Sequence, residues 1–157
     1  MKDTIPTHFF VLAVVRDGDR FLVVEERDGT WYLPAGRVEL GESLVAALVR
    51  ETIEEAAQLV GVHGIVGVDH TWHGGHARVR FVFSAYLGVR TPPKDQPDHH
   101  SRRAAWLSRE AIAALPLRHV EVLRWIDRVT RGAPLLPASA YEWVGPEGSP
   151  QTIEGRQ

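Results

Sequence analysis

Residues 36–58 read GRVELGESLVAALVRETIEEAAQ, and the spacing of three glutamates in this stretch decides what the fold must accommodate. Glu51, Glu54 and Glu55 stand at i, i+3 and i+4, which places their carboxylates within an arc of about 100° on a helix. Like charges at this spacing destabilise an isolated helix by roughly 0.2–0.5 kcal/mol per pair. A bound divalent cation would offset this repulsion, and clustered oxygen ligands suit Mg²⁺ or Mn²⁺. Taken alone, RETIEE also fits a solvated acidic helix face.

The predicted helix has its N-cap at Ser43 and begins near Leu44. Its apolar positions form one stripe, and the three glutamates lie off that stripe. The members of the stripe are Val45, Val49, Ile53 and Ala56, with Leu44 and Leu48 widening it. We therefore expect the helix to pack on a sheet while its carboxylates face elsewhere.

Strands are predicted on both sides of this helix, and two further helices follow. β-Branched and aromatic runs predict strands at residues 8–16, 20–27, 31–33, 62–72 and 77–87, with a short one at 103–107. Turn residues predict hairpins at 17–19 and 73–76. Helices are expected over 108–115 and 119–131, with a polar loop at 91–101 before them. This order predicts the α/β (α+β) class, with a mixed β-sheet sandwiched between helices in α/β/α layers.

The overall composition limits the kinds of partner. The chain has 157 residues, and we expect one domain over 1–133 and a C-terminal tail over 134–157, partly ordered at best. A formal charge of −2 argues against a nucleic-acid polymer as partner, and without cysteines there is no disulfide or thiolate chemistry. No signal peptide and no apolar run near the ~20 residues of a membrane span are found, so we expect a cytoplasmic protein without a membrane partner. Whether it forms a homodimer stays open.

Six residues at fixed spacing match one known motif. They are Gly36, Glu42, Arg50, Glu51, Glu54 and Glu55, and the stretch resembles the Nudix box, GX5EX7REUXEEXGU, in which U is aliphatic. On these residues the chain is identified as a member of the Nudix (MutT-type) hydrolase family. The resemblance covers roughly residues 8–131 and implies the helix–sheet–helix sandwich of that family.

The resemblance also implies a reaction, the hydrolysis of a phosphoanhydride bond by a metal-activated water. Mg²⁺ or Mn²⁺ would be held by Glu51, Glu54 and Glu55 together with the backbone carbonyl of Gly36. The family pattern assigns Glu42 and Arg50 to an ion pair that braces the loop against the helix. One carboxylate of the cluster can act as general base, and all three glutamates remain alternatives for that role.

The sequence departs from the motif near the end of the helix. Thr52 stands where an aliphatic residue is usual, and Ile53 is expected to carry that packing. Ala57 replaces a glycine that normally ends the helix in a left-handed conformation, which alanine resists, and Gln58 replaces the closing aliphatic residue. We therefore expect the helix to run past Ala57 and to end at Gly61.

Candidates for substrate contacts lie outside the motif's acidic residues. Trp72 and Phe83 stand on strands expected to border a cleft, where an aromatic face suits a stacked base, and Arg37 follows the motif glycine. A place in the core is the alternative for both aromatic residues. Further acids that would assist the metals are sought in the loops, with ordinary solvation as the alternative: Glu39, Asp95 and Asp98.

The flanks of the motif bear on the substrate. The stretches WYLPAGRVELGE, VRFVFSA and AAWLSRE resemble Nudix phosphatases that act on 8-oxoguanine nucleoside diphosphates. LPAG with the VE-x-GES loop is also similar to bacterial Nudix phosphatases of broad nucleotide and thiamine-precursor specificity. These likenesses imply hydrolysis of a nucleoside di- or triphosphate, oxidised guanine nucleotides included. The alternatives are another nucleoside-diphosphate-linked substrate, a thiamine-precursor pyrophosphate, or a non-catalytic module that senses nucleotides.

Overall fold

The structure is a computed structural model that describes residues 3–145 and 150–151. Its strands are β1 (Thr7–Asp17), β2 (Arg20–Glu25), β3 (Trp31–Tyr32), β4 (Ala35–Arg37), β5 (Val60–His73), β6 (His76–Leu87), β7 (Arg103–Ser108), β8 (Leu136–Pro137), β9 (Trp143–Val144) and β10 (Pro150–Gln151). Its α-helices are α1 (Leu44–Ala56), α2 (Arg109–Ala113) and α3 (Glu121–Thr130). No helix in the described residues is long and apolar enough to cross a membrane.

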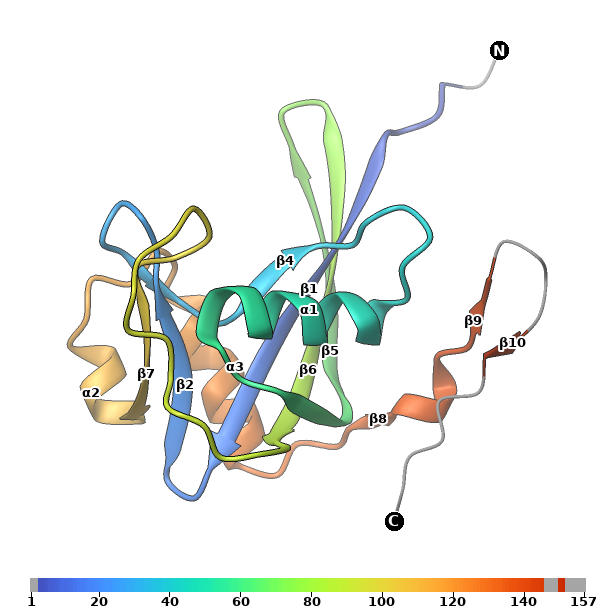
Figure 1. Cartoon of the computed structure of the whole chain (residues 1–157). Coiled ribbons are helices and arrows are strands. Elements are labelled where there is room, and N and C mark those ends of the chain that lie inside the picture. The colour runs from blue at the N-terminus through green and yellow to red at the C-terminus, as the bar shows by residue number, and fades with distance from the viewer. Residues whose placement is uncertain (1–2, 146–149, 152–157) are drawn as a thin grey trace.

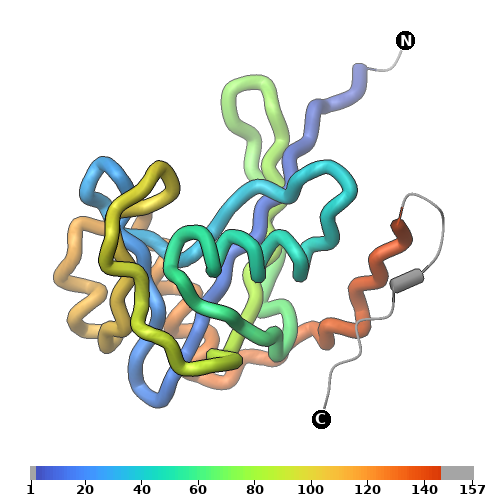
Figure 2. The backbone as a smooth tube through the Cα atoms, in the orientation of Figure 1, coloured from blue at the N-terminus to red at the C-terminus, as the bar shows by residue number. Residues whose placement is uncertain are grey.

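Within the described residues, eight strands form one mixed sheet, and β9 pairs only with β10. The strand order is β3-β2-β1-β6-β5-β8, with β4 paired to β1 and β7 paired to β2. The β1–β6 pair is parallel and the other pairs are antiparallel. Both predicted hairpins are confirmed, and Figure 2 shows the β5–β6 hairpin projecting beside the first residues of β1.

Helices cover both faces of this sheet, as Figure 1 shows with α1 in front and α3 behind. Val11, Ala13 and Val15 of β1 belong to a core formed with α1, whereas Leu12 and Val14 belong to a second core formed with α2 and α3. Because alternate residues of β1 enter different cores, the strand is apolar on both sides. The predicted α/β/α layering is therefore confirmed.

A local split in the sheet positions the motif. β1 pairs with β2 only at Arg16 and Asp17, whereas β4 pairs with the Phe10–Leu12 part of β1. Gly36 thus lies opposite Val11, on the face that carries α1. β4 was not predicted from the sequence, because three residues after a proline carry too little pattern to indicate a strand.

Two predictions about α1 need correction. Most of the predicted stripe is confirmed, because Leu44, Leu48 and Ala56 are buried and Val45 and Val49 pack against the core. Ile53, however, is 47% exposed, and Ala47 and Thr52 are buried in its place. The buried stripe is therefore rotated from the predicted one by about one residue, which brings the glutamates to its edge. Thr52 fits the interior because its hydroxyl donates a hydrogen bond to the carbonyl of Leu48, at 2.7 Å.

The helix also ends earlier than predicted. Ala57 adopts the left-handed conformation, with φ 56° and ψ 34°, so α1 stops at Ala56 and does not reach Gly61. The turn points the fully buried Gln58 inward, where its Nε2 donates to the carbonyls of Thr91 and Pro92, each at 3.1 Å. These bonds offset the strain that alanine incurs in this conformation.

The loop at residues 91–101 holds this end of the helix in place. The backbone N–H of Lys94 donates to Ala56 O, its Nζ donates to Glu54 O, and the hydroxyl of Ser101 donates to Glu55 O. The final carbonyls of a helix have no partner within it. The loop supplies those partners and so fixes the turn that carries Glu54 and Glu55.

The segment after residue 133 was predicted to be a tail that is partly ordered at best, and its described part packs onto the domain. β8 pairs with β5 at Gly64 and Ile65. Tyr141 packs against the core under α1, and its hydroxyl accepts a hydrogen bond from the N–H of Leu44, at 3.1 Å. Residues 146–149 and 152–157 of the predicted tail lie outside the described residues.

Candidate active site

Arg50 is the hub of the acidic residues around α1. Its Nε donates to Glu42 at 2.8 Å, and its Nη2 donates to the same carboxylate and to the carbonyl of Arg37, each at 3.0 Å. Its Nη1 donates to Glu51 at 2.8 Å and to Glu54 at 3.0 Å. The predicted Glu42–Arg50 ion pair is present, and the same guanidinium offsets the repulsion between Glu51 and Glu54.

Gly36 is required by the position of Glu51. A Cβ built on Gly36 would lie 1.9 Å from the carboxyl carbon of Glu51, so any side chain here would displace that carboxylate. Glycine is therefore needed at this position to let the Glu51 carboxylate approach the backbone, and not to adopt an unusual backbone angle. It brings the Glu51 carboxylate directly against the backbone of β4.

Glu55 lies closer to the protein interior than the other two glutamates. Its carboxylate accepts a hydrogen bond from the N–H of Ala35, at 3.0 Å, and burial raises the pKa of Glu55 to about 8. Burial also raises the pKa of Glu51, although the hydrogen bond from Arg50 opposes this shift. The pKa of Glu42 is lowered, chiefly by its hydrogen bond from Arg50. Three carboxylates within one motif thus have different proton affinities.

The donor atoms of this cluster fit a hard divalent cation, because all are carboxylate or carbonyl oxygens. Gly36 and Glu51 are in contact, as a site shared by strand and helix requires. Within residues 3–145 and 150–151, however, no three His, Asp or Glu side chains are already gathered as a metal-ligand group. Arg50 engages one oxygen of Glu51 and one of Glu54. Binding of a cation would therefore require rearrangement around Arg50.

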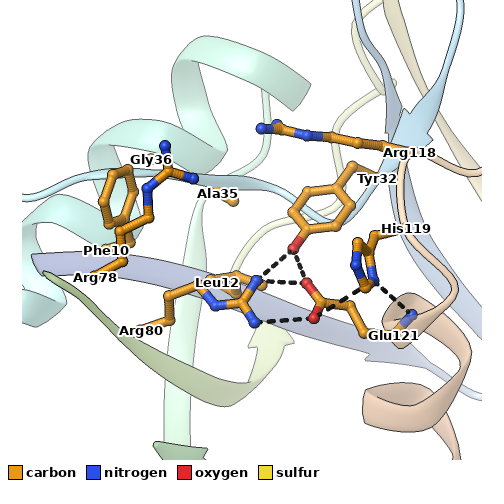
Figure 3. A pocket seen from close by; sticks show the side chains of 10 residues that line it. All are labelled: Phe10, Leu12, Tyr32, Ala35, Gly36, Arg78, Arg80, Arg118, His119 and Glu121. Atoms are coloured by element: carbon orange, nitrogen blue, oxygen red, sulfur yellow. Dashed lines mark hydrogen bonds and ion pairs between the residues drawn. The ribbon is translucent and has the colours of Figure 1, made fainter. Parts of the chain in front are cut away.

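A cavity of about 220 Å³ lies on the other side of β4 (Figure 3). Phe10, Ala35 and Gly36 form the wall nearest the acidic cluster. Basic and aromatic side chains complete the lining: Tyr32, Arg78, Arg80, Arg118 and His119, with Leu12 and Glu121. Gly36 borders this cavity and also contacts Glu51, so it connects the pocket to the acidic cluster.

A polar network forms the deep part of the pocket. Glu121 accepts hydrogen bonds from the hydroxyl of Tyr32, at 2.5 Å, and from both terminal nitrogens of Arg80. Arg80 also donates to both oxygens of Asp69. Burial would raise the pKa of Glu121, but the bonds from Arg80 and Tyr32 outweigh it and lower that pKa below its usual value. The network fixes an ionised carboxylate inside the protein.

Two further arginines stand at the pocket over aromatic rings. Arg78 lies 5.6 Å from the centroid of Phe10, and Arg118 lies 5.2 Å from that of Tyr32. Arg118 also pairs with Glu26 at 2.8 Å. In the part of the chain that the structure describes, Arg78 has neither a side-chain hydrogen bond nor an ion pair. Its charge is thus available to a ligand.

The predicted substrate residues lie elsewhere. Phe83 is 1% exposed in the core under α1, so the prediction that it contacts substrate is wrong, because no ligand reaches it there. Trp72 is 62% exposed near the β5–β6 turn and does not line the pocket. Arg37 borders a groove on the opposite face of β4, together with Glu51.

The additional acids also differ in their surroundings. Asp98 pairs with Lys94, and the hydrogen bond from Lys94 holds its pKa well below the usual range, so it is engaged within the loop. Asp95 lies in the same loop, whereas Glu39 borders the groove beside Glu51. His100 was interpreted from the sequence as a polar loop residue, with metal binding as the alternative, and its Nδ1 lies 3.8 Å from Glu54.

Comparisons with known proteins agree with this geometry. The family model described as NUDIX domain matches residues 6–126. The 8-oxo-dGDP phosphatase NUDT18 of Mus musculus is 34% identical over 152 residues, which cover 92% of this chain and 45% of that protein. A MutT-like protein of Streptomyces ambofaciens is 28% identical over 132 residues, 82% of each chain. A NUDIX hydrolase structure from Nitrosomonas europaea has a TM-score of 0.75 and 31% identity, covering 88% of this chain and 97% of that one. The chain spans less than half the length of the mouse relative.

Proposed function

Because this chain belongs to the Nudix hydrolase family, we propose that it hydrolyses the phosphoanhydride bond of a nucleoside di- or triphosphate with Mg²⁺ or Mn²⁺ as cofactor. The observation that carries this proposal is the contact between Glu51 and Gly36, because Gly36 also borders the basic pocket. A nucleotide whose base enters the pocket would present its phosphates to the acidic cluster. Oxidised guanine nucleotides are the first substrates to test, because the mouse relative is named for 8-oxo-dGDP.

The residues of the cluster have separable roles in this proposal. Glu51, Glu54 and the carbonyl of Gly36 would hold the metal, with Glu55 as a further ligand or as the proton acceptor. The bound metal would neutralise phosphate charge and lower the pKa of the attacking water. Arg50 and Glu42 keep the loop and helix in register, as their two-point hydrogen bond indicates.

Glu55 is the best placed of the three glutamates for general base. The N–H of Ala35 fixes its carboxylate, and a pKa of about 8 makes it a better proton acceptor than an exposed carboxylate. The proton of the attacking water would pass to a Glu55 oxygen. Ionised Glu55 is the competent form, and the charge of a metal bound beside it would favour that form.

On the pocket side, Arg78 would bind the phosphate chain or the base from above Phe10, since its charge has no ion pair among residues 3–145 and 150–151. The carboxylate of Glu121 offers an acceptor for N–H groups of a base, held in position by Arg80 and Tyr32. A guanine ring presents such donors on its pairing edge. These contacts support a nucleotide over a simple inorganic pyrophosphate.

The test is a substrate panel with products identified, run with Mg²⁺ on the wild type, Glu54→Gln and Glu55→Gln. The panel contains GDP, GTP, 8-oxo-dGDP, 8-oxo-dGTP and thiamine diphosphate. Glu110→Gln, an exposed change on α2, is the matched control and should keep the wild-type rate. Turnover of guanine nucleotides that falls at least about 100-fold in both site variants supports the proposal. Wild-type rates in both site variants would contradict the mechanism, and nucleotide binding without turnover would establish a sensing module.

A further inference from the structure

One edge of the sheet is free along the outer part of the β5–β6 hairpin. β5 pairs with β6 along one side, whereas on its other side β8 pairs with it only at Gly64 and Ile65. No other strand among the described residues pairs with β5. Residues 67–73 therefore form an unpaired edge, which we call the β5 edge. Figure 1 shows the turn end of this hairpin extending beyond α1.

The turn of the hairpin determines which backbone groups of the β5 edge point outward. The glycines at 74–75 have φ values of 56° and 83°, as the two central residues of a type I′ turn require. Such a turn closes on the residues that flank it, so the backbone N–H and C=O of His73 point toward β6. The pairing with β6 has no register shift along the β5 edge, so these directions alternate regularly. The backbone groups of Val68, His70 and Trp72 therefore point away from β6, where an added strand would meet them.

The same three residues expose their side chains on the α1 face of the sheet. Val68 lies opposite Phe81, which packs against the core under α1. The alternation of strand side chains places His70 and Trp72 on the same face as Val68. Val68 is 49% exposed and Trp72 is 62% exposed. Natural proteins commonly protect an edge strand with lysine or proline, and residues 67–73 contain neither.

We propose that the β5 edge pairs antiparallel with the β5 edge of a second copy of this chain, about a twofold axis at His70. The unpaired stretch of residues 67–73 is centred on His70, and the backbone groups of His70 point outward. A twofold axis at this residue brings each outward-facing backbone group of one copy to an outward-facing group of the other. β8 ends the free edge on one side and the turn ends it on the other, so the added strand fits between them.

The side chains of the two copies are also complementary in this pairing. On the α1 face Val68 meets Trp72 of the second copy, and each indole covers an exposed valine. On the α3 face Asp69 meets Thr71 of the second copy, whose hydroxyl can donate to the carboxylate. Asp69 is the only acidic residue of the β5 edge and is already paired with Arg80, at 2.6 Å, so no uncompensated like charges face each other.

The size of the contact sets the expected strength. One pair of short strands covers less than the roughly 1,200 Å² of a stable interface, so the dimer is a transient one. Its affinity comes mainly from the backbone hydrogen bonds between the strands, as in other cases of strand addition. We expect a reversible dimer with a Kd of about 100 μM. An extended peptide could meet the same backbone groups, but a second copy also supplies a tryptophan for each exposed valine.

Sedimentation equilibrium at protein concentrations below and above this Kd tests the dimer. The average mass of the wild type should rise with concentration toward that of two chains. His70→Pro removes an outward N–H and leaves the bonds to β6 in place, so this variant should fold and stay monomeric. Val68→Lys places a charge on the β5 edge and should also stay monomeric. Val89→Lys is the matched control, because Val89 is 58% exposed outside β5 and β6, and it should dimerise as the wild type does.

Cross-linking tests the position of the axis. The chain has no cysteine, so a single introduced thiol reports only its own surroundings. His70→Cys places the thiols of two copies opposite each other, at a Cα separation of about 5.5 Å that suits a disulfide. His73→Cys is the matched control, because it is exposed on the same strand but its two thiols lie roughly 20 Å apart. Under mild oxidation with diamide, His70→Cys should form linked dimers at least about tenfold faster than His73→Cys.

Three results would overturn this inference. They are a wild-type mass that stays at one chain over the whole concentration range, equal dimerisation of Val68→Lys and Val89→Lys, and equal cross-linking of the two cysteine variants. If His70→Pro does not fold, Val68→Lys and the cross-linking rates still decide the question. None of these measurements involves turnover, so the outcome is independent of the proposed function.

Discussion

The two sides of β4 place charge in opposite ways. On the α1 side one arginine, Arg50, contacts the carboxylates of Glu42, Glu51 and Glu54. On the α3 side one carboxylate, Glu121, accepts hydrogen bonds from Arg80 and Tyr32. The first arrangement is built from residues 42–54, within one loop and one helix. The second joins Tyr32 of β3, Arg80 of β6 and Glu121 of α3, which are far apart in the sequence.

This difference has a consequence for what each side can do. In the proposed mechanism Glu51 and Glu54 would exchange Arg50 for a cation, because both bind carboxylate oxygens through charge. The pocket side holds its groups in fixed positions, because Glu121 is 7% exposed and its partners are engaged with each other. The acidic side is therefore suited to chemistry and the basic side to recognition.

The largest effect is expected for Glu55→Gln. Activity should fall at least about 100-fold, the range of a lost general base. In the absence of metal, the variant should be more stable than the wild type at high pH. The pKa of Glu55 is raised from 4.5 to about 8 on folding, so the carboxyl stabilises the fold less and less as pH rises through that window. Glutamine keeps the bond to the Ala35 N–H without the charge, so the Glu55→Gln variant should be more stable than the wild type at pH 9, by up to about 5 kcal/mol.

Thermal unfolding at pH 5 and pH 9, with EDTA present, measures the second part. The wild type should lose more stability than Glu55→Gln between these two pH values. Equal pH dependence in both proteins would mean that burial does not perturb this carboxyl. If Glu55→Gln loses activity but its stability depends on pH as that of the wild type does, Glu55 takes part in the reaction without a raised pKa.

The next effect tests the rigidity of the pocket side. Arg80→Met leaves Glu121 and Asp69 without their main partner, and removal of one member of a buried pair costs roughly 3–5 kcal/mol. The double variant Arg80→Met/Glu121→Leu should recover part of that loss, since it no longer buries a lone charge. Denaturant unfolding of both variants measures this. A double variant that is no better than the single one would show that the network is not a coupled unit.

A smaller effect is expected where the pocket meets the ligand. Arg78 has no ion pair among the described residues, so Arg78→Ala should leave the melting temperature within about 2 °C of the wild type. KM for the nucleotide should rise about tenfold, the cost of one charged contact of about 1.4 kcal/mol. Arg78→Lys should recover part of this. A loss confined to kcat would place Arg78 in the reaction itself and not in binding.

The two sides of β4 also differ in how far the sequence predicts them. On the acidic side the Glu42–Arg50 ion pair was predicted and is present, because helix periodicity and the Gly36-to-Glu55 spacing are local, whereas metal binding by the glutamates stays a prediction. The pocket was not predicted, because Phe10, Tyr32, Arg78 and Glu121 are brought together only by the strand pairing. A local signal did exist in the alternation of Arg78 and Arg80, which puts two cations on one face of β6.

Aromatic residues were the least predictable from sequence. Phe83 and Trp72 both read as strand aromatics, yet one is in the core and the other is largely exposed. Whether each side chain is buried depends on how far α1 extends over the β5–β6 hairpin, and no local sequence pattern specifies that. Trp143 stands in a segment with no strand or helix pattern of its own, and it lines a hollow together with Glu51 because Tyr141 anchors that segment.

The smallest effect is expected at the end of α1. Ala57 replaces the glycine of the motif there, and the prediction that the helix continues to Gly61 was wrong. Alanine in the left-handed conformation destabilises the folded protein by roughly 1–2 kcal/mol, and glycine removes this strain. Glycine also makes the unfolded chain more flexible, which opposes the gain in stability by roughly 0.4–1 kcal/mol. Ala57→Gly should therefore stabilise the protein by about 0.5–1 kcal/mol, measured by denaturant unfolding. The activity should stay unchanged, because Lys94 and Ser101 already hold the turn that carries Glu54 and Glu55. A gain in stability accompanied by a fall in kcat would show instead that the strain at Ala57 helps to position the acidic cluster, and that the α1 side is less self-contained than its local contacts indicate.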